Sequence, residues 1–142
     1  MARIDELAKK GEDFAFETTM SSRSFVPLLR RLESEDYVMT LVYVWLRSAD
    51  LAVQRVAERV RRGGHSIPEA EVRRRYERGL ANFWRLYRPL ADLWVLCDNS
   101  EREIAMVARG TVDLTSAVFD ERRFHEIRTA IASGASTRGA KQ

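Results

Sequence analysis

The chain has 142 residues, of which 45% are hydrophobic and 9% aromatic, and this is enough for one globular domain and excludes disorder of the whole chain. The formal net charge is +3, and the single cysteine, Cys97, excludes a disulfide framework and favours the reducing cytoplasm. The longest apolar run, residues 37–46, is half of the roughly 20 residues that a membrane helix needs, and the charged opening does not resemble a signal peptide. We therefore expect a cytoplasmic protein with no membrane partner.

The first third of the chain predicts two helices and two strands. Residues 2–11 form a short amphipathic pattern that stops at Gly11, and residues 21–35 form a second one with Pro27 in its first turn. Residues 13–17, DFAFE, have the profile of a buried strand. Residues 37–46, YVMTLVYVWL, show no polar alternation and predict a strand buried on both faces. Two strands separated by a helix predict a right-handed βαβ unit.

The central segment, residues 55–80, predicts two arginine-rich helices joined by a glycine hinge. Gly63 and Gly64 end the first helix, because glycine tolerates the positive φ that a helix C-terminus often requires. Ser66 and Glu69 have the spacing of a capping box for the second helix, which runs to about Pro89. Between residues 47 and 88 the chain carries eleven arginines and only five acids. Arginine binds phosphate and carboxylate well, which favours an oxyanion partner, but a GC-rich genome produces the same bias without function.

The last third predicts two more strands and a helix. The strands are residues 92–98 and 104–108, and the helix is residues 120–132, with Phe124, Ile127 and Ile131 on one face. Residues 133–142 are expected to be a flexible tail. Strands that alternate with helices predict one α/β domain over residues 1–132, with a mainly parallel sheet flanked by helices.

Polar residues follow three of the predicted strands: Glu17 with Thr19, Arg47 with Ser48, and Asp98 with Asn99. In parallel sheets the ligand site gathers at the carboxyl ends of the strands. The first and third sets also have a structural interpretation, as a cap or ion pair for Glu17 and as turn formers for Thr19, Asp98 and Asn99. The two histidines do not have ligand spacing, so no protein-built zinc site is expected.

Three motifs in this order resemble the zeta toxin-like branch of the P-loop kinases. They are Glu17-Thr18-Thr19 at a strand exit, RVRRGGHSIPEAEVRRRYERGLANF around the hinge, and Trp94 followed by Asp98-Asn99-Ser100, and the likeness covers residues 2–110. The resemblance implies a P-loop phosphotransferase fold that uses ATP and Mg²⁺ to phosphorylate a small molecule, which is a UDP-linked amino sugar for the best-known members.

The same resemblance implies roles for individual residues. Glu17 and Thr19 would contact the acceptor substrate. Arg75, together with either Arg59 or Arg62, would clamp the phosphates from a lid formed by residues 55–88. Guanidinium groups stabilise the charge that develops on a transferred phosphoryl group, and a two-glycine hinge permits lid closure. Asp98 and Asn99 would contact the nucleotide.

The sequence departs from the family in one respect: it contains no GxxxxGK[ST] loop, and its three lysines lie at positions 9, 10 and 141. We therefore expect a family member truncated at its N-terminus and inactive alone. A missing N-terminal segment or an antitoxin protein is then the expected protein partner. Two alternatives remain open: a basic module that binds RNA or another polyanion, although no nucleic-acid motif is present, and a non-catalytic remnant.

Overall fold

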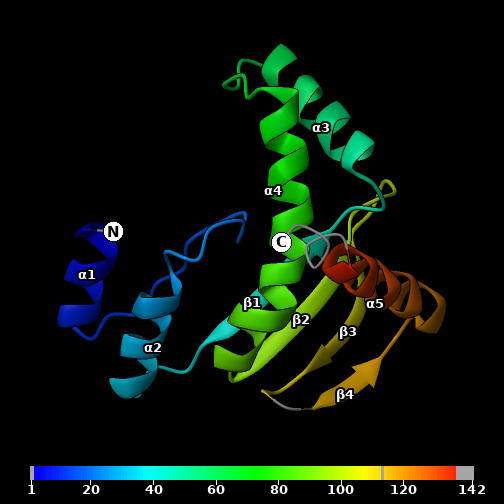
Figure 1. Cartoon of the computed structure of the whole chain (residues 1–142). Helices are drawn as coiled ribbons and strands as arrows, with labels where there is room; N and C mark the ends of the chain where they lie inside the picture. The colour runs from blue at the N-terminus through cyan, green and yellow to red at the C-terminus, as the bar shows by residue number, and fades with distance from the viewer. Residues whose placement is uncertain (1, 113, 137–142) are drawn as a thin grey trace.

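The sheet has four strands, and only one pair of them is parallel (Figure 1). The computed structural model describes residues 2–112 and 114–136. The strands, in both chain and sheet order, are β1 (Thr40–Trp45), β2 (Leu93–Asp98), β3 (Ala105–Gly110) and β4 (Thr115–Val118). β1 pairs with β2 in parallel, and the other two pairs are antiparallel. The α/β class is confirmed. The mainly parallel sheet is wrong, because the short links after β2 and β3 allow hairpins but no crossover.

The parallel pair is joined by the predicted helix, hinge and helix. The connection contains α3 (Ala49–Arg61), α4 (Glu69–Asn82), a π-helical turn (Phe83–Tyr87) and a 3₁₀ turn (Arg88–Leu90). Gly63 has a φ of 93° and follows the end of α3, as expected. The predicted capping box is wrong: Pro68 takes the N-cap position of α4 without a side-chain cap, and the Glu69 carboxylate accepts a hydrogen bond from Arg73 instead.

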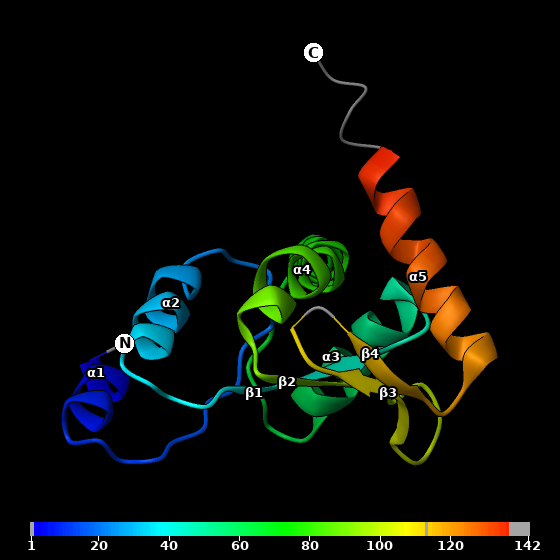
Figure 2. The same cartoon turned by 90° about the horizontal axis from the view of Figure 1, so that it is seen from below.

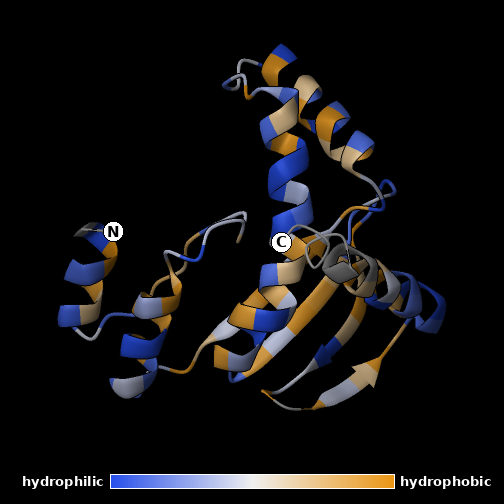
Figure 3. Cartoon of the chain, viewed as in Figure 1, coloured by the Kyte–Doolittle hydropathy of each residue, from blue (hydrophilic) through white to orange (hydrophobic). Residues whose placement is uncertain are grey.

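Among the described residues, helices cover only one face of the sheet. α4 and α5 (Glu121–Ser136) lie over the same face (Figure 2), and the core between them and the sheet is formed by Phe83, Tyr87, Trp94, Leu96, Val107 and Ile127. On the opposite face, Val42 and Val44 are 52% and 46% exposed. The prediction that residues 37–46 are buried on both faces is therefore wrong. Figure 3 shows hydrophobic residues along β1 and β2, while the middle of α4 is mainly hydrophilic.

The N-terminal lobe forms a second, smaller core beside the sheet. α1 (Ala2–Lys9) and α2 (Val26–Ser34) pack through Ala8, Leu28 and Leu32. Both predicted helices exist. α2 begins later than expected, because Ser22 and Ser24 hydrogen-bond to each other instead of capping the helix.

The predicted strand at residues 13–17 is wrong. This stretch is irregular and belongs to no sheet, so the βαβ unit predicted from it is also absent from the described residues. Its two aromatic rings pack against the N-terminal lobe: Phe14 against Tyr37 and Phe16 against Phe25. Strand β4, which the sequence analysis missed, is short and half-exposed and therefore has a weak apolar pattern.

The C-terminal helix is longer than expected. α5 continues to Ser136, beyond the end expected at residue 132, and residues 137–142 of the expected tail lie outside the described part of the chain. In the described part of the chain, no helix is both long and apolar enough to cross a membrane.

Candidate functional site

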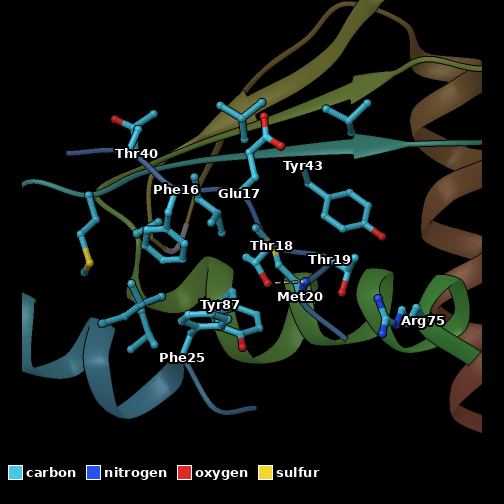
Figure 4. A pocket seen from close by; sticks show the side chains of 18 of the residues that line it. Phe16, Glu17, Thr18, Thr19, Met20, Phe25, Thr40, Tyr43, Arg75 and Tyr87 are labelled. Carbon is cyan, nitrogen blue, oxygen red and sulfur yellow. Dashed lines mark hydrogen bonds between the residues drawn. The ribbon is translucent and has the colours of Figure 1, made fainter. Parts of the chain in front are cut away.

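A cavity of about 1180 Å³ lies between residues 13–20 and β1, and α2, α3 and α4 also contribute to its walls (Figure 4). Four of the predicted site residues line it: Glu17, Thr19, Arg59 and Arg75. They come from an irregular segment, from α3 and from α4, so only the tertiary structure brings them together.

Three contacts to α4 and the following turn hold residues 17–22, which we call the anchored segment. The side chain of Asn82 donates a hydrogen bond to the Met20 carbonyl oxygen at 2.8 Å, and the Tyr87 hydroxyl donates one to the Ser22 carbonyl oxygen at 2.5 Å. Gly79 lets the backbone of the anchored segment approach α4 closely, since a Cβ at this position would meet the Thr19 carbonyl oxygen at 2.7 Å. Met20 has a φ of 53°, so the chain turns sharply at this point.

The anchored segment presents polar groups to the cavity. The Thr19 hydroxyl shares a hydrogen bond of 2.9 Å with Ser21. The Thr18 hydroxyl accepts a bond from the Met20 amide at 3.2 Å. The Glu17 carboxylate is exposed, and it makes no ion pair or hydrogen bond with any residue of the described chain. Its oxygens are therefore available to accept a hydrogen bond from a ligand.

Arg75 lies one helical turn before Gly79, at the end of the cavity where Thr19 and Tyr43 are found (Figure 4). Its Nε donates to the Glu71 carboxylate at 2.7 Å, and this carboxylate also accepts two bonds from Arg74. These donors, first Arg75 and then Arg74, lower the pKa of Glu71 below its ordinary value. The ion pair fixes the stem of Arg75 and leaves its terminal N–H groups for an anion.

The structure distinguishes between Arg59 and Arg62, the two candidate arginines that precede the hinge. Arg59 lines the cavity and makes no ion pair with another described residue, whereas Arg62 caps the end of α3 outside the cavity. A Cβ at Gly64 would meet the Arg59 Cγ at 2.9 Å and its carbonyl oxygen at 3.0 Å. Gly64 therefore does more than bend the chain, because its missing side chain makes room for Arg59.

Asp98 and Asn99 lie outside the cavity. The Asp98 carboxylate forms an ion pair with Arg123 at 2.8 Å, accepts the Ser100 amide at 2.9 Å and is also bonded to the Ser100 hydroxyl. Asp98 is only 6% exposed, so these contacts use its oxygens. The backbone amide of Asn99 donates a hydrogen bond to the Trp45 carbonyl oxygen at 2.9 Å. Asn99 therefore connects the end of β2 to the end of β1, and the Asp98 side chain connects the end of β2 to α5.

Of the three polar sets at the predicted strand ends, the Arg47 set and the Asp98 set lie next to each other, and Ser100 connects them. The backbone amide of Arg47 donates to the Ser100 hydroxyl at 2.8 Å, and the Arg47 guanidinium pairs with Glu101 at 2.7 Å. Glu17 and Thr19 line the cavity, where neither Arg47 nor Asp98 is found. The predicted single site at the carboxyl ends of the strands therefore divides into a structural cluster and a separate cavity.

The aromatic lining of the cavity was not predicted from the sequence. Tyr43 points from β1 toward the Arg75 end (Figure 4), and burial raises its pKa above the ordinary value, so its hydroxyl stays neutral. Phe25 and Tyr87 contribute apolar surface. The period-two placement of Leu41, Tyr43 and Trp45 on one side of the strand was the available signal.

No protein-family model, curated protein or solved structure matches the chain. Its chemistry must therefore be argued from the geometry. Among the described residues, no cluster of three or more His, Cys, Asp or Glu side chains is placed to hold a metal ion. The cavity offers an apolar body, a carboxylate acceptor at Glu17, and guanidinium donors at Arg59 and Arg75. This arrangement suits a ligand that has a hydroxyl group, a ring or apolar body, and a negative charge.

Proposed function

We propose that this chain forms the acceptor-binding and lid part of an ATP-dependent small-molecule phosphotransferase of the zeta toxin-like type. The observation that carries the proposal is the shared cavity. Glu17 and Thr19 were assigned to the acceptor, and Arg75 and one hinge arginine to the phosphates, and all four line it. The mixed sheet adds no support, because a single parallel pair is common to many α/β folds.

In this proposal Glu17 accepts a hydrogen bond from the acceptor hydroxyl and Thr19 orients it. Arg59 and Arg75 bind the anionic group of the acceptor, and the glycine hinge between α3 and α4 lets the two arginines approach it together. Tyr87 and Phe25 supply apolar contacts for the body of the acceptor. Each role belongs to binding and orientation, which reduce the entropic barrier of a transfer reaction.

The described residues do not fit ATP and Mg²⁺. Asp98, the expected nucleotide contact, is held by Arg123 and Ser100, and the sequence contains no GxxxxGK[ST] loop. The phosphate-donor site would therefore have to come from another segment or another chain. The 142-residue chain alone should show no ATP turnover, and turnover that Arg75→Ala abolishes would contradict this division of the site.

Acceptor binding can be measured by isothermal titration calorimetry with UDP-N-acetylglucosamine as the probe. Loss of a charge-assisted hydrogen bond costs about 1.5–3 kcal/mol, so Arg75→Ala should weaken binding by about tenfold or more. Arg74→Ala is the matched control, because Arg74 bonds the same Glu71 carboxylate but does not line the cavity. Absence of binding by the wild-type chain, or equal weakening by both variants, would refute the acceptor site and favour a non-catalytic remnant.

The polyanion-binding alternative gains no support from the structure. Arg73, Arg74 and Arg75 all form ion pairs with acids on α3 or α4. These pairs engage three of the eleven arginines of residues 47–88 within the chain. A steep loss of RNA affinity with added salt would be required to restore the alternative.

A further inference from the structure

Two backbone edges face each other across the cavity. Every residue from Asp13 to Met20 lines it, and so does every residue from Tyr37 to Val44. Successive side chains of an extended chain point to opposite sides, so side chains alone would bring only every second residue to the cavity. Because every residue of both runs lines it, the cavity faces the edge of the backbone. The walls of the cavity are therefore two peptide edges as well as a set of side chains.

Both edges have unused hydrogen-bonding groups. β1 pairs with β2 on one side, and no other strand of the described chain pairs with its second side. Residues 13–19 make no backbone–backbone hydrogen bond with any other described residue. Leu46 directly follows β1, and its carbonyl oxygen accepts a hydrogen bond from the Tyr76 hydroxyl at 2.8 Å. An unpaired strand edge is a template for another strand.

The size of the cavity matches one strand. A strand of six residues is about 20 Å long, 4.8 Å wide and 10 Å deep, which is about 950 Å³, and the cavity has about 1180 Å³. A polypeptide strand also presents donors and acceptors at the same repeat as β1, which small ligands do not.

We propose that the cavity binds an extended peptide segment of a partner protein, about six residues long, as an additional strand on the free edge of β1. Phe25, Leu29 and Tyr87 favour apolar residues at alternate positions of this peptide. Arg75 stands at the end of the cavity near Tyr43 (Figure 4) and favours a negative charge at that end of the peptide, such as its terminal carboxylate.

This inference goes beyond the proposed phosphotransferase part and does not depend on it. Peptide and small acceptor would occupy the same cavity, so the peptide would exclude the acceptor. Peptide binding can nevertheless be detected in the absence of any acceptor, and each proposal can therefore fail alone.

The test is a selection on the complete 142-residue chain, using displayed random heptapeptides with free carboxyl ends. The best synthetic peptide is then mapped by hydrogen–deuterium exchange. It should slow amide exchange in residues 13–19 and in β1, and N-methylation at every second peptide residue should weaken binding by about tenfold or more, since each removed donor breaks a strand hydrogen bond. Arg75→Ala should weaken binding, and the Arg74→Ala control should not.

Four results would overturn the proposal. One is a selection that yields no binder. Another is a peptide that protects a different surface, and a third is equal affinity of the N-methylated peptide. The last is protection of residues 13–19 in the free chain, because this would mean that the segment already closes on β1 as a fifth strand and leaves no room for a partner.

Discussion

Replacing Asn82 with alanine should release the anchored segment from α4. The Asn82 side chain is 7% exposed and donates its hydrogen bond to a carbonyl group 62 residues earlier in the chain, that of Met20, which is itself 5% exposed. Leaving a buried acceptor without its donor costs about 1–3 kcal/mol. The better helix propensity of alanine returns about 0.6 kcal/mol. The net destabilisation should therefore be about 0.4–2.4 kcal/mol, because the lost hydrogen bond outweighs the gain in propensity.

Thermal unfolding followed by circular dichroism measures this difference, which for a chain of this size corresponds to about 4 °C per kcal/mol. Gln54→Ala is the matched control, since it also removes a helical amide side chain, but from an exposed position on α3. The control should change stability by less than about 0.5 kcal/mol. Hydrogen exchange should also accelerate in residues 17–22 of the Asn82 variant. Equal unfolding temperatures for the two variants would refute the anchoring role of Asn82.

Three further predictions concern the hinge, the thiol and the lid. Gly64→Ala should displace Arg59 and weaken UDP-N-acetylglucosamine binding in calorimetry, because the new Cβ would lie 2.9 Å from the Arg59 Cγ; unchanged affinity would contradict this contact. Burial raises the pKa of Cys97, so iodoacetamide should alkylate it more slowly than a free thiol at pH 8, and mass spectrometry of native and urea-unfolded protein checks this difference. Arg74→Ala should raise the pKa of Glu71 in an NMR titration by removing one of its guanidinium donors, and an unmoved titration would argue against that bond.

Local patterns predicted most of the elements correctly. The helix, glycine hinge and helix between β1 and β2 are present because apolar spacing and Gly63 act over a few residues. The strands that begin at Thr40 and Leu93 also agree with their apolar runs. Residues 13–17 have the composition of a strand but do not form one, since a strand needs a neighbouring edge within hydrogen-bonding distance and composition carries no information on that distance.

The candidate site was likewise predicted only in part from the sequence. The sequence indicated which residue types could bind an anion and a hydroxyl group, and it named Arg59 and Arg62 as equal candidates. The structure separates them, because only Arg59 lines the cavity. It also assigns Asp98 to an ion pair with Arg123, a partner 25 positions away that no local spacing reveals.

By itself, then, the sequence determined the five helices and the strands β1, β2 and β3, the hinge and the chemistry of the candidate residues, since these depend on side-chain type and short-range spacing. Only the tertiary structure decided the antiparallel half of the sheet, the open face and free edge of β1, and the cavity beside it. These features depend on which distant segments pack together. Packing is set by the summed contacts of the whole chain and has no local signature.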